Sequence, residues 1–124
     1  MKKDIETRDD IILLVNTFYN SVKENPILAY IFDDVAQVDW NTHLPKMYSF
    51  WGSLLLGERN ALGNPMEKHI ELSKITKLSG TEFDEWIFLF TNTVDVLFEG
   101  KKANDAKQRA ANIARLMLFK IQNV

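Results

Sequence analysis

The two histidines of this sequence are its strongest candidates for chemistry, because imidazole binds metals and exchanges protons near neutral pH. His43 is followed at helical spacing by Met47, Phe50 and Leu54, which predicts that it faces the core. His69 follows a stretch rich in glycine and asparagine. Taken singly, each histidine is better explained as a structural residue with a satisfied hydrogen bond. As a pair from separate helices in an aromatic interior, they favour a shared site.

Missing residue types exclude several kinds of site. The absence of cysteine rules out a disulfide framework, thiolate zinc sites, iron–sulfur clusters and thiol catalysis. Two histidines fall short of the usual zinc ligand set, and no Glu-x-x-His motif for a di-iron bundle occurs. There is no Gly-x-Ser-x-Gly elbow and no glycine-rich phosphate loop. A haem site remains, because the porphyrin supplies ligands and one imidazole from the protein suffices.

The composition is that of an ordinary globular protein. The chain has 124 residues, 46% of them apolar and 26% charged, which fits a single domain over residues 1–124. Its 15 basic and 17 acidic residues give a net charge of -2, so we expect no nucleic-acid partner. The locally basic stretch 101–120 is interpreted as a solvated helix face. No apolar run approaches the roughly 18 residues that span a bilayer, and we expect a cytoplasmic protein without membrane contact.

Helical spacing of apolar residues predicts an all-α fold, since period-two alternation is sustained nowhere. Thr7 is the expected N-cap of the first helix, and Pro45 favours a cap at Asn41 or Thr42 for the third, because proline is best tolerated in a first turn. The predicted helices cover about 8–23, a short segment from Pro26, a segment ending near Leu56, a short helix from Pro65, a segment from Ser79 or Thr81 to Phe98, and about 103–122. The last helix is expected to turn inward Ile113, Leu116, Met117 and Ile121.

Four segments carry a resemblance to a known family. They are Phe18-Tyr19, residues 40–51, residues 63–69 and residues 83–86, and the most specific is His-Leu-Pro-Lys-Met followed by Phe-Trp. In this order the segments resemble the truncated haemoglobins, specifically their third group, over nearly the whole chain. Ala61 departs from the family, whose members often carry an aromatic residue there. The resemblance implies a truncated-globin fold, a 2-on-2 helical sandwich around haem.

The resemblance also implies a set of site residues. His69 would be the proximal ligand of a five-coordinate iron in haem b (iron protoporphyrin IX), and Tyr19, His43 and Trp86 would be hydrogen-bond donors on the distal side. Lys46 could reach a haem propionate, although a solvated lysine explains it equally well. The remaining residues expected at the cofactor are Phe32, Met47, Phe50, Trp51, Met66 and Phe83, each of which would singly be explained as core.

The function implied is the binding of dioxygen, with nitric oxide, carbon monoxide, cyanide and peroxide as further candidate ligands. A peroxidase-like or nitric-oxide-dioxygenase-like haem enzyme, served by an unidentified electron donor, would use the same residues. A haem-free helical sensor or interaction domain is the third alternative, and it predicts a colourless protein. The sequence leaves the first two alternatives open.

Overall fold

The computed structural model describes residues 2–30, 40–57 and 80–122. These residues form α1 (Arg8–Glu24), α2 (Pro26–Tyr30), α3 (Trp40–Leu56), α5 (Gly80–Leu97) and α6 (Lys101–Gln122), and none of the residues described is in a strand. The predicted all-α fold is therefore confirmed. The short helix expected from Pro65 lies outside the described residues.

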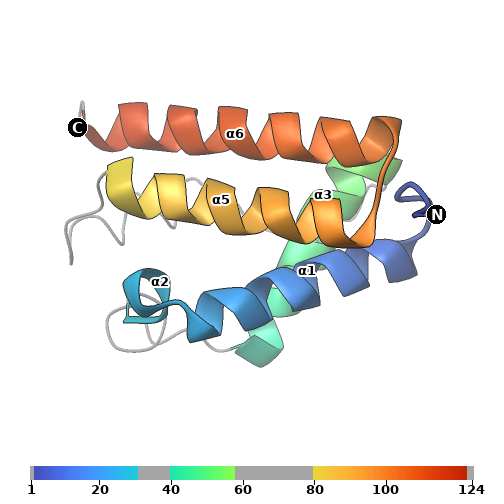
Figure 1. The fold of residues 1–124 in the computed structure, drawn as a ribbon, viewed down its shortest axis with the longest axis horizontal. Coiled ribbons are helices and arrows are strands. Elements are labelled where there is room, and N and C mark those ends of the chain that lie inside the picture. Colours follow the sequence, from blue (N-terminus) through green and yellow to red (C-terminus); the bar gives the residue numbers. More distant parts are fainter. Residues whose placement is uncertain (1, 31–39, 58–79, 123–124) are drawn as a thin grey trace.

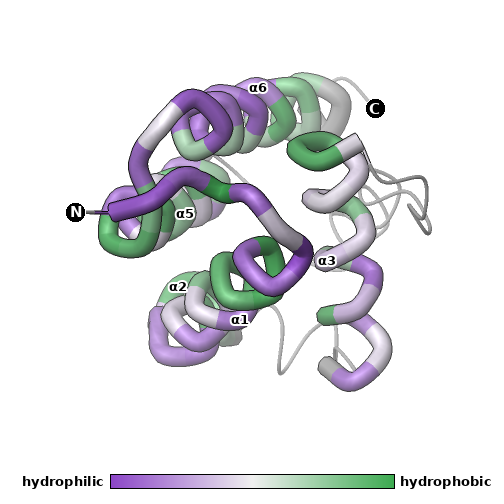
Figure 2. The backbone as a smooth tube through the Cα atoms, turned by 90° about the vertical axis from the view of Figure 1, so that its right-hand side faces the viewer, coloured by the Kyte–Doolittle hydropathy of each residue, from purple (hydrophilic) through white to green (hydrophobic). Residues whose placement is uncertain are grey.

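The helices pack as two pairs that share one core. α5 and α6 lie side by side, α1 packs against both α3 and α5, and α3 crosses behind α1 (Figure 1). Viewed end-on, α6, α5, α1 and α3 surround a common centre (Figure 2). The pairs α5·α6 and α1·α3 are thus joined mainly through the contact of α1 with α5.

The start of α1 is held by a reciprocal capping box. The hydroxyl of Thr7 accepts the Asp10 N–H at 3.3 Å, and the Asp10 carboxylate accepts the Thr7 N–H at 3.0 Å, so the predicted N-cap is confirmed. Burial acts to raise the pKa of Asp10, but its hydrogen bonds with Lys3 and with the Glu6 and Thr7 N–H groups outweigh that effect and lower it. The ionised carboxylate therefore stabilises the first turn.

The predicted start of α3 was wrong. The helix begins at Trp40, before the expected caps at Asn41 and Thr42, so that Pro45 lies inside it. Pro45 cannot donate to the carbonyl of Asn41, but Asn41 is exposed and water can reach that carbonyl. The predicted end is confirmed, because α3 stops at Leu56 and Gly57 follows with φ +72°.

The N-terminal segment ties the start of α6 to the rest of the fold. The carboxylate of Asp4 accepts the N–H groups of Lys102 and Ala103 at 3.0 and 2.8 Å, and the Lys3 carbonyl accepts the Glu99 N–H at 3.0 Å. Burial acts to raise the pKa of Asp4, but these backbone hydrogen bonds outweigh it and lower the pKa. α6 consequently begins at Lys101, two residues before its predicted start.

The core is centred on the fully buried ring of Phe90. Trp51 and Trp86 stack on it, with ring centroids 4.8 and 5.7 Å away, and Phe18 meets it edge-on at 5.3 Å. These contacts join α1, α3 and α5. α1 contributes six buried apolar or aromatic residues, namely Ile11, Leu14, Val15, Phe18, Tyr19 and Val22.

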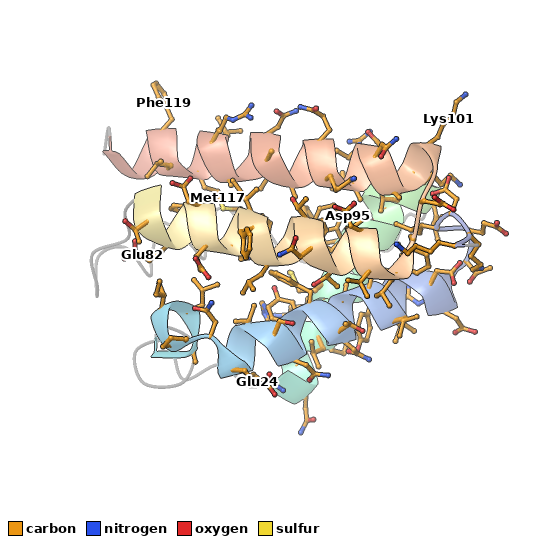
Figure 3. The ribbon with its side chains drawn as sticks, viewed as in Figure 1. Glu24, Glu82, Asp95, Lys101, Met117 and Phe119 are labelled. Carbon is orange, nitrogen blue, oxygen red and sulfur yellow. The ribbon has the colours of Figure 1, made fainter. Side chains whose placement is uncertain are left out.

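Small residues let α6 approach α5 closely. The buried stripe on α6 consists of Ala103, Ala106, Ala110, Ala114 and Met117. Figure 3 shows Met117 directed toward α5 while Phe119 points away from the bundle. Leu116, one position off the stripe, is 45% exposed, so its predicted inward orientation was wrong. Ile113 is half-buried, and the side chain of Ile121 lies outside the described residues.

Replacing Gly100 with alanine is expected to lower the free energy of unfolding by about 1–3 kcal/mol, measured by urea unfolding. Gly100 has φ +134°, and a Cβ there would lie 2.6 Å from Cγ of Asp4. Gly57→Ala is the matched control, because Gly57 has φ +72° and open space around a Cβ. It should cost less, about 1 kcal/mol. Equal losses in the two variants would contradict the role given to the Asp4 contact.

Candidate functional site

The structure brings two predicted site residues into direct contact. Tyr19 on α1 and His43 on α3 lie 3.2 Å apart, measured from the phenol oxygen to Nε2, and their rings meet edge-on with centroids 5.3 Å apart. Tyr19 is buried and His43 is half-buried. Depending on the imidazole tautomer, either the phenol O–H or the Nε2 N–H donates. The pair therefore places two polar groups within otherwise apolar packing.

Burial keeps the Tyr19 phenol neutral. Removal from water penalises the phenolate and raises the pKa of Tyr19 well above its ordinary value of 10. The hydroxyl therefore retains its proton over the physiological range and can donate a hydrogen bond to a polar ligand.

Trp86 reaches the same region from α5. The ring of Phe18 contacts Tyr19 at 4.9 Å and Trp86 at 5.6 Å between centroids, so Phe18 joins the two predicted distal donors. Trp86 itself is half-buried. Sequence reasoning did not give Phe18 this role, although its place beside Tyr19 on a buried helix face was a usable signal.

The predicted cofactor contacts on α3 and α5 divide into half-buried and enclosed side chains. Met47 and Phe50 are half-buried and continue the helical stripe that begins at His43, and Lys46 beside them is also half-buried. Trp51 is buried against Phe90, as described above. Phe83 is buried as well, and it packs with Ala114 and Met117 of α6.

Comparisons with known proteins find similar proteins in one family. No family model matches the chain. The chain is 29% identical over 126 residues to the group 3 truncated hemoglobin ctb of Campylobacter jejuni subsp. jejuni serotype O:2, with 97% of each protein covered. The crystal structure of group III truncated hemoglobin from Campylobacter jejuni matches with a TM-score of 0.84 and 27% identity, over 98% of this chain and 95% of that one. In sequence and in fold, this chain is similar to the group III truncated haemoglobins.

This similarity to the truncated haemoglobins confirms the predicted fold and supports haem-based gas binding as the general function. It also implies haem as the cofactor. The described residues fit a haem group. Met47 and Phe50 form a half-buried apolar stripe on α3 that suits a large flat ring, and the Tyr19–His43 pair supplies polar hydrogens beside it. In the segments described, no helix is long and apolar enough to cross a membrane.

The predicted proximal ligand and two of the predicted cofactor contacts lie outside the described residues. Phe32, Met66 and His69 all fall in segments that the structure does not describe. Among the residues that it does describe, no group of three or more histidine or carboxylate side chains could hold a metal ion directly.

Two polar contacts near the site were not anticipated from the sequence. The Tyr48 hydroxyl on α3 donates to the Asn16 side-chain oxygen on α1. The side-chain amide of Asn25, at the end of α1, donates to the Glu85 carboxylate on α5 at 2.7 Å. The spacing of Asn16 three residues before Tyr19 was the available signal, since such residues share a helix face.

Replacing Tyr19 with phenylalanine is expected to reduce the loss of stability of the protein at high pH. The pKa of Tyr19 is higher in the folded state than in the unfolded state. The contribution of its neutral phenol to the free energy of unfolding is therefore complete below pH about 10 and is lost as the pH rises further. Above that pH, the free energy of unfolding of wild type should fall more steeply than that of Tyr19→Phe, by up to about 1.4 kcal/mol per pH unit. Urea unfolding at several alkaline pH values measures this, and parallel pH profiles would exclude the effect.

Proposed function

We propose that this chain, as one domain over residues 1–124, holds haem b through His69 and binds dioxygen and other diatomic gases at a five-coordinate iron. Tyr19, His43 and Trp86 would donate hydrogen bonds to the gas. The observation that carries this proposal is the 3.2 Å contact of Tyr19 with His43, beside the half-buried apolar stripe of α3.

The distal donors would act on the charge of the ligand. When bound, the haem supplies a ferrous iron as the site for the gas. A phenol, imidazole or indole hydrogen directed at a ligand with partial negative charge would contribute about 1.5–3 kcal/mol. One such donor from Tyr19, His43 or Trp86 would change the affinity by roughly 10- to 100-fold. Several donors together would slow the release of dioxygen, which suits chemistry or sensing better than bulk delivery.

The apolar residues would exclude water from the cofactor. Met47 and Phe50 present half-buried apolar surface on α3, and Phe32 and Met66 are proposed to complete the wall. Trp51 and Phe83 support it from the core, where they pack against Phe90 and α6. A dry pocket strengthens each hydrogen bond to the ligand and limits oxidation of the iron. Lys46, beside the stripe, is proposed to pair with a propionate.

The absorption spectrum of the purified protein, reduced and then exposed to carbon monoxide, tests the proposed proximal ligand. Wild type should bind haem, and its absorption bands should shift on adding the gas as expected for a histidine-ligated iron. His69→Ala should lose this spectral shift. The other histidine provides the matched control, since His43→Ala should retain a histidine-ligated spectrum. A wild-type spectrum in His69→Ala would overturn the assignment.

The rate of dioxygen release tests the proposed distal donors. Tyr19→Phe and Trp86→Phe each remove one donor while keeping an aromatic ring, so each should raise the off-rate by about 10-fold or more in stopped-flow measurements. Phe88→Leu is the control, because Phe88 lies on α5 two residues beyond Trp86 and is exposed. Rates equal to wild type in both donor variants would dismiss the distal role.

A further inference from the structure

Two polar contacts connect α1 with α3. One joins Tyr19 to His43, at 3.2 Å, and the other runs from the Tyr48 hydroxyl to the side-chain oxygen of Asn16. Both contacts are partly buried, and they lie among apolar side chains of the same two helices. The second contact has no part in the function proposed above.

The order of the partners shows what the second contact does. Asn16 and Tyr19 are three residues apart, so they are neighbours on one face of α1. The α3 partners occur in the opposite order, because the earlier residue His43 bonds to Tyr19 and the later residue Tyr48 bonds to Asn16. Two contacts at different positions along the helices restrict both sliding and rotation, whereas one contact would still allow the helices to rotate about it.

Apolar packing alone would not hold the first contact at hydrogen-bonding distance. Attraction between apolar surfaces is not directional, and it tolerates small shifts of one helix along another. A hydrogen bond weakens steeply outside a narrow range of distance and angle. Phe18 and Trp51 bring α1 and α3 onto the same core, and polar partners add the directional contacts that the alignment of Tyr19 with His43 needs.

Tyr48 is not on the stripe proposed to meet the cofactor. It lies five residues after His43, which rotates it by roughly 140° around a helix of 3.6 residues per turn. From these observations we propose that Tyr48 and Asn16 are positioning residues, whose hydrogen bond aligns α1 with α3 and so holds Tyr19 and His43 together. The effect on ligand binding rests on the proposed function, but the effect on the pair does not.

Two variants remove this hydrogen bond with little change of size, namely Tyr48→Phe and Asn16→Leu. Asn16→Asp keeps an acceptor oxygen and should behave like wild type. Ser53→Ala is the matched control, because Ser53 lies on α3 and its hydroxyl donates within that helix, to the Ser49 carbonyl. The readouts are the His43 ring signals in NMR spectra of the carbon-monoxide-bound protein and the dioxygen off-rate. With only two histidines in the chain, His43→Gln assigns the signals.

The His43 ring signals decide the inference. They should move in Tyr48→Phe and Asn16→Leu and stay unchanged in Asn16→Asp and Ser53→Ala, a pattern that a general loss of stability would not produce. The off-rate should rise by about three- to tenfold in Tyr48→Phe, and the same substitution should add nothing when Tyr19→Phe is already present.

The two proposals fail in different ways. Unmoved His43 signals in Tyr48→Phe and Asn16→Leu would overturn the positioning role, even if Tyr19→Phe alters the off-rate and so supports the distal donors. An off-rate that is unchanged in Tyr19→Phe would instead overturn the proposed function. Moved His43 signals would still support the positioning role in that case.

Discussion

The ring of Phe90 is the point at which three helices of this protein meet. Trp51 and Trp86 stack on it and Phe18 closes its edge, so that α1, α3 and α5 are oriented by contacts to one fully buried side chain. Aromatic pairs in such geometries are stabilising beyond their buried area. Because Phe18 precedes Tyr19 and Trp86 is itself part of the stack, the same cluster brings the proposed distal residues together.

Local patterns in the sequence predicted most of the helices. Thr7 and Asp10 make a capping box that depends only on neighbouring residues, and Gly57 ends α3 because it adopts a positive φ. Two predictions from local patterns were wrong. Pro45 was expected in a first turn, yet α3 begins five residues earlier. Leu116 was expected to face inward, but the alanine stripe determines which face of α6 packs, and Leu116 is exposed.

The sequence predicted residues for the candidate site but not the contacts between them. Helical spacing and family resemblance pointed to Tyr19, His43 and Trp86, and the structure brings Tyr19 and His43 within 3.2 Å. The bond of Tyr48 to Asn16 was missed because spacing defines a face of one helix, whereas a contact between helices depends on where they cross. The roles of these residues at a haem remain predictions, as does that of His69.

The position of Asp4 has a consequence for how the chain reaches its fold during synthesis. Its carboxylate binds N–H groups 98 and 99 residues away, so this contact has very high contact order. α1 can cap itself as it leaves the ribosome, but the Asp4 carboxylate cannot reach the N–H groups of Lys102 and Ala103 until the start of α6 has emerged. This part of the fold can therefore be completed only after the start of α6 has been made.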